Sequence, residues 1–174
     1  IGITLGLYIP GDQVSYFFQP EDPDANVLRT VFHEATHQLF SETRPSRQPI
    51  AVQGNFWIVE GIACYMESFE QTEEGFVLGD PSYVRFQNAR DRRLGRKEIE
   101  LEPYYRPLVQ FTAMGQDDYQ RDPQQRANYS QGAGLAHFFM HFQEGLYRDD
   151  FIEHLSEVYS QASRTRASPR SLEE

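Results

Sequence analysis

Two short runs of β-prone residues open the chain, with a turn-forming segment between them. Ile3–Ile9 and Val14–Phe18 are rich in β-branched and aromatic residues, and Pro10-Gly11-Asp12-Gln13 separates them. Runs of this kind on either side of a turn cluster are typical of a β-hairpin. We therefore predict a hairpin at the front of the fold.

The next segment has the apolar period of a helix. We expect Asp24 to cap a helix that runs from Ala25 to about Phe40. The apolar residues fall on one broad side of it, which we expect to face the core: Val27, Leu28, Val31, Phe32, Ala35 and Leu39. His33 and His37 then point to the opposite side, as residues lining a cleft would.

The remaining pattern predicts mainly helices. The expected elements are a helix over Asn55–Phe69, a short strand or loop edge at Gly75–Leu78, a polar surface helix over Pro81–Leu94 ending at Gly95, a short apolar helix over Pro107–Met114, a loop over Gly115–Arg126, a strongly apolar helix over Ala127–Gln143 and an amphipathic helix over Asp149–Gln161. Together with the hairpin they predict an α+β, mainly helical fold. Residues 1–162 are expected to form one domain and residues 163–174 a polar tail.

Composition excludes several classes of function. The chain has 174 residues, of which 39% are apolar and 14% aromatic, as expected for a globular domain. Its net charge of −10 argues against nucleic acid and against a basic membrane-surface helix. No apolar run is long enough for a membrane span. Cys64 is the only cysteine, so neither an internal disulfide nor a Cys-rich zinc site can form. No signal peptide is visible, and the compartment is left undetermined.

The segment His33-Glu34-Ala35-Thr36-His37 reads H-E-x-x-H. Residues four apart lie on one face of a helix, so His33 and His37 can bind one metal ion side by side. Glu34 lies next to them, where it could take a proton from a metal-bound water. The pattern is short and needs a third ligand to support it.

Glu60 is the candidate for that third ligand. It lies in Trp57-Ile58-Val59-Glu60-Gly61-Ile62-Ala63, on the helix that follows the histidine helix after one loop. Catalytic zinc usually keeps three protein ligands and one open position. Gly61 would let the two helices approach closely. The alternative is that Glu60 is a solvated helix carboxylate.

These two motifs together resemble the gluzincin metallopeptidases, the clan that contains thermolysin and the zinc aminopeptidases. The resemblance implies that His33, His37 and Glu60 hold Zn²⁺ and that Glu34 is the general base. Tyr129-Ser130-Gln131-Gly132-Ala133 is similar to the Y-x-K-G-A stretch of the zinc aminopeptidases. There the tyrosine hydrogen-bonds the oxyanion, a role that would fall to Tyr129; the alternative is a core or helix-start tyrosine.

The whole chain, from about Leu5 to Tyr159, resembles a bacterial family of peptidase-MA-like domains of unassigned function. That family has a hairpin, a "HEATHQL"-like helix and a "W-x-x-EG-x-A-x-Y-x-E" helix, and it slightly favours an extracytoplasmic location. The chain also departs from the clan. It lacks a G-x-M-E-N element, which puts aminopeptidase specificity in doubt, and Gln131 replaces the lysine of the tyrosine motif. It starts too close to the histidine helix for a full thermolysin-like N-terminal sheet, so we expect a fragment of a longer protein.

Each of the other residues with a reactive or metal-ligating side chain has two interpretations. His137 and His141 are packing histidines, or one of them supports a zinc ligand or lines the cleft, and His154 is expected at the surface. Cys64 is a small buried side chain or points toward the metal. Glu67 orients a ligand imidazole or is exposed. The acidic cluster before the histidine helix caps that helix or binds calcium: Asp12, Glu21, Asp22 and Asp24.

The sequence therefore leads to one hypothesis and one rival. The hypothesis is a zinc-dependent metallopeptidase-like hydrolase that acts on a peptide or protein substrate, with an extended peptide pairing along Ile3–Ile9 by β-augmentation. The rival is a catalytically inactive peptidase-like domain that binds zinc or another protein. Substrate preference, endo- or exopeptidase action and oligomeric state stay open.

Overall fold

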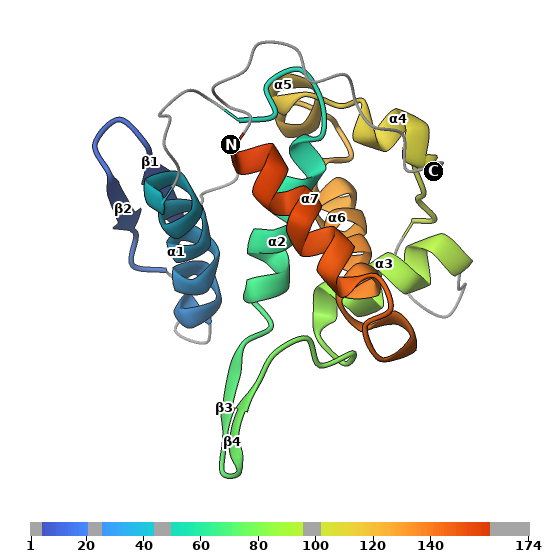
Figure 1. Ribbon diagram of the computed structural model, residues 1–174, viewed down its shortest axis with the longest axis horizontal. Coiled ribbons are helices and arrows are strands. Elements are labelled where there is room, and N and C mark those ends of the chain that lie inside the picture. The colour runs from blue at the N-terminus through green and yellow to red at the C-terminus, as the bar shows by residue number, and fades with distance from the viewer. Residues whose placement is uncertain (1–4, 21–25, 44–49, 96–101, 161–174) are drawn as a thin grey trace.

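The computed structural model of the protein describes residues 5–20, 26–43, 50–95 and 102–160, and these form an α+β, mainly helical fold (Figure 1). The strands are β1 (Gly6–Ile9), β2 (Val14–Phe17), β3 (Glu70–Thr72) and β4 (Gly75–Val77). The helices are α1 (Val27–Thr43), α2 (Phe56–Met66), α3 (Val84–Leu94), α4 (Leu108–Thr112), α5 (Gln116–Gln120), α6 (Gln125–His141), the 3₁₀ turn η1 (Phe142–Glu144) and α7 (Arg148–Ser160). The predicted fold class and the N-terminal hairpin are confirmed. The tail from Ser163 onward lies outside the described residues.

The core is built around α2, which is buried from Phe56 through Tyr65. A helix that is apolar on nearly all sides belongs in the centre of a fold. Trp57 packs there against the rings of Phe111, Phe139 and Phe151, which come from α4, α6 and α7. This central position places every side chain of α2, including the polar ones, inside the protein.

Glycine allows α2 and α6 to approach closely. A Cβ atom at Gly61 would lie 2.8 Å from the carbonyl oxygen of Gly132. The sequence predicts that Gly61 brings α2 close to the histidine helix. Instead, the nearest neighbours of this position all belong to α6, and α6 is the helix that carries Tyr129.

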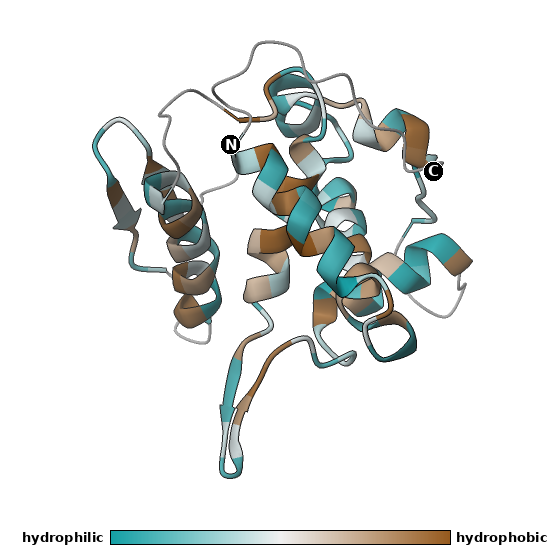
Figure 2. Cartoon of the chain, in the orientation of Figure 1, coloured by the Kyte–Doolittle hydropathy of each residue, from teal (hydrophilic) through white to brown (hydrophobic). Residues whose placement is uncertain are grey.

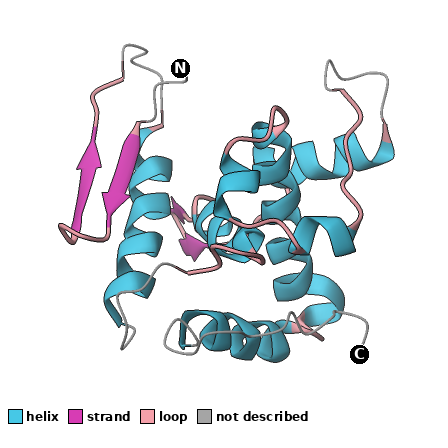
Figure 3. Ribbon diagram, turned by 90° about the horizontal axis from the view of Figure 1, so that it is seen from above, coloured by secondary structure: helices cyan, strands magenta, loops and turns pink. Residues whose placement is uncertain are grey.

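The N-terminal hairpin packs on α1. Strands β1 and β2 pair antiparallel, with Leu7 opposite Tyr16, and Figure 3 shows them on one side of α1 with the other helices on its opposite side. Gly6 permits this contact, since a Cβ atom there would lie 2.5 Å from Thr30 Cγ2 and 2.8 Å from Glu34 Cγ. Strand β1 therefore runs directly past Glu34.

The predicted core-facing side of α1 is wrong. Leu28 is 64% exposed and Leu39 62% exposed, and Ala35 is also exposed, whereas the buried residues of α1 are Glu34 and Thr36. Hydrophobic and hydrophilic residues both occur along α1 (Figure 2). The reason is the position of α2, which lies on the histidine side of α1. Helix α1 thus faces the protein interior with its polar side.

The start of α1 also differs from the prediction. The helix begins at Val27, and the side-chain oxygen of Asn26 accepts a hydrogen bond from the backbone N–H of Arg29 at 3.3 Å. Asn26 therefore acts as the cap. Asp24, the expected cap, lies outside the described residues, as do Glu21 and Asp22.

The predicted loop over Gly115–Arg126 contains the short helix α5. Tyr119 anchors this helix, because its ring is fully buried against those of Phe56, Phe111 and Tyr129. One apolar residue in a polar stretch gives no helical period, which explains the wrong prediction.

Other boundaries agree closely with the prediction. Helix α3 ends where Gly95 adopts a left-handed conformation with φ of 59°. The short strand expected near Gly75–Leu78 is β4, which pairs with β3 in a hairpin that projects from the body (Figure 1). Among the described helices none has the length and apolar character needed to cross a membrane.

Candidate metal centre

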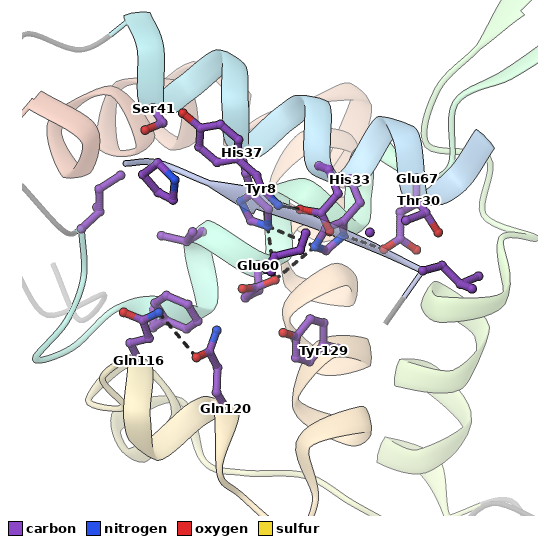
Figure 4. Close-up of a pocket in the computed structure, with 18 of the residues that line it drawn as sticks. Tyr8, Thr30, His33, His37, Ser41, Glu60, Glu67, Gln116, Gln120 and Tyr129 are labelled. Carbon is purple, nitrogen blue, oxygen red and sulfur yellow. Dashed lines mark hydrogen bonds and ion pairs between the residues drawn. The ribbon is translucent and has the colours of Figure 1, made fainter. Parts of the chain in front are cut away.

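His33 and His37 on α1 meet Glu60 on α2 at one point (Figure 4). The Nε2 atoms of the two histidines are 3.1 Å apart. Glu60 Oε2 lies 3.3 Å from His33 Nε2 and 3.5 Å from His37 Nε2. The i, i+4 spacing places the imidazoles on the same face of α1, and the burial of α2 places Glu60 beneath them.

These separations match the geometry of a four-coordinate metal ion. Zinc–ligand distances near 2 Å in a tetrahedron place neighbouring ligand atoms roughly 3.3–3.5 Å apart. Glu60 Oε2 is buried and accepts no hydrogen bond of normal geometry, although both imidazole nitrogens are near it. Glu60 is only 5% exposed, so it is not a solvated surface carboxylate. The three side chains form a group that can hold a metal ion.

Glu67 fixes the orientation of His33. Its Oε1 atom lies 2.7 Å from His33 Nδ1, so Nδ1 can donate a hydrogen bond to Glu67. Nε2 is then the nitrogen that faces His37 and Glu60. Glu67 is buried, and the prediction that it orients a ligand imidazole agrees with this contact.

The electrostatics of the group favour a bound cation. Burial raises the pKa of Glu60, but the nearby imidazoles of His37 and His33 outweigh burial and hold the pKa well below its usual value. Burial also raises the pKa of Glu67, but the hydrogen bond from His33 and the charge of Arg85 lower it to about 2. Two carboxylates are therefore ionised next to imidazole nitrogens, which is an environment that attracts a metal ion.

Glu34 lies next to the three ligand candidates and is fixed by the hairpin. Its Oε2 atom accepts a hydrogen bond from the backbone N–H of Tyr8 at 2.8 Å, and its side chain is buried. The structure thus holds a buried carboxylate in the same cavity as the three ligand candidates, with one oxygen oriented by β1.

Tyr129 faces the same point from α6 (Figure 4). Its ring is stacked on that of His33, with centroids 6.5 Å apart and an interplanar angle of 21°. Burial, followed by the negative charge of Glu60, raises the pKa of Tyr129. The phenol therefore keeps its proton and can donate a hydrogen bond.

These side chains line one cavity of about 640 Å³. Its walls come from β1, α1, α2, α3, α5, α6 and α7, and Gln116 and Gln120 of α5 lie opposite α1 (Figure 4). A cavity of this size is typical of a ligand site.

The other candidates do not enter this group. His137 Nε2 lies 3.1 Å from the carbonyl oxygen of Gly79, and His141 Nε2 lies 2.8 Å from the hydroxyl of Tyr65. Both histidines therefore have the structural role of linking α6 to neighbouring segments, and His154 on α7 is half-buried.

Cys64 and Gln131 lie near the group in supporting positions. Cys64 is fully buried, and its Sγ atom lies 3.9 Å from His33 Nδ1, on the side away from His37. Gln131 accepts a hydrogen bond from the backbone N–H of Arg106 at 2.9 Å and donates one to the carbonyl of Arg106 at 2.7 Å. Its amide thereby anchors a loop, a role that lysine could not fill, because an ammonium group has no acceptor for the Arg106 N–H.

Sequence reasoning missed Tyr83 and Arg85, which both hydrogen-bond Glu67. They lie at the start of a polar helix that was expected on the surface. The charge pattern gave no signal, because Arg85 is one of several arginines in that segment.

No family model, curated protein or solved structure matches this chain. A proposed function therefore depends on the residues and geometry of the site.

Proposed function

We propose that the protein is a zinc-dependent metallopeptidase of the gluzincin type. One observation carries the proposal: His33, His37 and Glu60 present three ligand atoms 3.1 to 3.5 Å apart, with Glu34 beside them. Two nitrogen ligands and one carboxylate oxygen are a donor group found in catalytic zinc sites of peptidases. The resemblance of both sequence motifs to the gluzincins supports the same assignment.

Each residue then has a defined task. When bound, zinc supplies Lewis acidity and lowers the pKa of a coordinated water. Glu34 accepts the proton of the attacking water and later transfers it to the leaving amine. Tyr129 donates a hydrogen bond to the oxyanion that forms at the scissile carbonyl.

The substrate would bind as an extended peptide along β1. Leu5, Gly6, Leu7 and Tyr8 line the cavity, and the Tyr8 N–H already contacts Glu34. Pairing of an extended chain beside a strand places alternate side chains into the cavity. The scissile carbonyl would then lie next to Glu34.

Metal content and cleavage measured on the same samples test this proposal. We expect purified wild-type protein to bind one zinc ion per chain, and His33→Ala to lose it. Glu34→Gln should retain zinc and lower cleavage of a peptide library by at least about 10²-fold, because the general base is removed. Glu42→Gln is the matched control, since Glu42 is an exposed glutamate on the same helix.

The possible outcomes separate the hypotheses. Wild-type protein that binds no zinc, together with a His33→Ala variant of unchanged stability, would contradict the metal site. Stoichiometric zinc without cleavage of any peptide would instead favour the inactive, zinc-binding domain.

A further inference from the structure

Arg85, at the start of α3, makes a two-pronged ion pair with the carboxylate that orients His33. Its Nε atom donates to Glu67 Oε2 at 2.7 Å and its Nη2 atom donates to Glu67 Oε1 at 3.1 Å. Such paired contacts fix the plane of the carboxylate as well as its charge. Among the described residues that line the cavity, Arg85 is the only arginine or lysine.

Glu67 has a full complement of donors. His33 Nδ1 and Arg85 Nη2 bind Oε1, while Arg85 Nε and the hydroxyl of Tyr83 bind Oε2. The carboxylate is also buried, with a side chain only 7% exposed. It cannot rotate without breaking several hydrogen bonds, so α3 determines the direction in which Glu67 holds the imidazole of His33.

Arg85 also reaches the other side of the site. Its guanidinium carbon lies 5.9 Å from the centroid of the Tyr129 ring, and that ring is stacked on His33. Arg85 therefore contacts both the residue that orients a ligand and the residue proposed to bind the oxyanion. Removing it would leave the buried charge of Glu67 without its cationic partner.

We propose that Arg85 is a positioning residue of the metal centre. Through Glu67 it holds His33 Nε2 toward His37 and Glu60, and it thereby increases the affinity of the site for zinc. The inference rests on the proposed metal site, but not on peptide cleavage. It assigns α3 a part in the metal centre, although α3 supplies no ligand.

The geometry of the guanidinium makes the requirement specific. Lysine at this position keeps the positive charge but can present only a point donor, so it cannot match both oxygens of Glu67. A structural role alone, in which any cation would neutralise Glu67, would leave Arg85→Lys equal to wild type.

Zinc affinity measured by competition with a chromophoric chelator tests the proposal. We expect Arg85→Gln to weaken zinc binding 10- to 100-fold, the range for loss of a group that supports a metal ligand. Arg85→Lys should retain part of the affinity and lose at least about threefold. Arg90→Gln is the matched control on the same helix, because Arg90 pairs with Asp91 and makes no contact with Glu67 in the described structure.

Two further measurements separate positioning from a loss of folding. The visible spectrum of the Co²⁺-loaded protein should change in Arg85→Lys, because the ligand field depends on the orientation of His33. The double variant Arg85→Gln/Glu67→Gln should bind zinc no more weakly than Glu67→Gln alone, since Arg85 acts through Glu67. Folding of each variant is checked by circular dichroism in the presence of chelator.

Each result decides a different question. If wild-type protein binds no zinc, the metal site itself is wrong. If wild-type protein binds zinc and folded Arg85→Lys binds it equally, with an unchanged Co²⁺ spectrum, the proposed role of Arg85 is overturned. Additive losses in the double variant would also overturn it.

Discussion

At the scale of single residues, the hydroxyl of Tyr129 is the group whose role can be separated most cleanly from metal binding. We expect Tyr129→Phe to bind zinc as wild type and to lower kcat/KM by about 10²- to 10³-fold, the usual effect of removing one oxyanion donor. The ring, and with it the stacking on His33, is kept. Cleavage of a peptide that wild-type protein hydrolyses, with zinc content measured in parallel, checks this.

Tyr147→Phe is the control, because Tyr147 lies outside the residues that line the cavity. An equal rate for Tyr129→Phe and wild type would show that the hydroxyl of Tyr129 does not contact the oxyanion.

The residues of the metal group could be predicted because their relation is local. His33, Glu34 and His37 share one helix, so their spacing alone places them together. Glu60 lies on the next helix, and it was predicted from its motif in combination with the histidine pair. Arg85 reaches Glu67 from a separate helix after an intervening hairpin, and only the tertiary structure sets that distance. The contact between Tyr83 and Glu67 could not be predicted for the same reason.

At the scale of elements, the contact between α2 and α6 depends on Gly61. Alanine would gain about 1 kcal/mol of helix propensity, but its Cβ atom would lie 2.8 Å from a backbone oxygen of α6. Overpacking of this kind costs typically about 1–3 kcal/mol, and a backbone oxygen cannot move without its helix. We therefore expect the upper end of this cost. After the gain in helix propensity is subtracted, Gly61→Ala should lower the free energy of unfolding by about 2 kcal/mol, measured by denaturant titration.

Gly11→Ala provides the comparison, since no atom lies within 4 Å of the added Cβ there. It should change the free energy of unfolding by less than about 0.5 kcal/mol, as surface substitutions usually do. A Gly61→Ala variant as stable as Gly11→Ala would show that α2 and α6 can separate freely.

The histidine pair of α6 gives the fold a pH dependence. Burial lowers the pKa of His137, while the carbonyl of Gly79 and the charge of Asp80 oppose it. Burial, followed by the charges of His137 and Arg148, lowers the pKa of His141. These two histidines therefore bind protons more tightly in the unfolded chain than in the folded protein. The free energy of unfolding should decrease as the pH falls below the ordinary histidine pKa of about 6.5.

The loss should end below the lowered pKa values of the folded protein. We compare the unfolding free energy of wild type with that of His137→Gln/His141→Gln. The value for wild type minus the value for the variant should decrease from pH 7.5 to pH 5. Using the difference removes the titration of all other groups. A difference that stays constant over this range would contradict the lowered pKa values.

The failures of prediction at this scale concern which face of a helix is buried. The apolar period of α1 is real, but Leu28 and Leu39 are exposed and Glu34 is buried. Hydrophobic pattern assumes that the apolar side faces the interior. At α1 the polar side, which carries the candidate metal ligands, faces α2. The local hydrophobic pattern contains no information about the position of α2.

At the scale of the whole molecule, the metal group joins two parts of the fold. α1 and the β1–β2 hairpin form one part, and α2 belongs to the core formed with α6 (Figure 1). The sequence predicted most of the elements and the candidate ligand group, but not that seven elements enclose one cavity. That arrangement depends on close contacts such as Gly6 against α1, which arise only when the chain is folded.

Removal of the metal should therefore loosen α1 and leave the core intact. In the proposed site, a metal ion would join His33 and His37 of α1 to Glu60 of α2, so its removal would take away a link between the two helices. A ligand at about 100 times its Kd stabilises the folded state by about 2.7 kcal/mol. We expect chelation of zinc to lower the free energy of unfolding by the amount that this relation gives for the zinc concentration and the Kd of the site.

Hydrogen exchange locates the effect. Amides of α1 and of the β1–β2 hairpin should exchange faster when zinc is chelated, whereas those of α2 and α6, which share the buried core, should change little. Glu34→Gln should respond to chelation as wild type does, because it keeps all three ligands, and His37→Ala should not respond. Uniform acceleration across α1, α2 and α6 would mean that the metal supports the entire core, and that α1 is not a separately stabilised part of the fold.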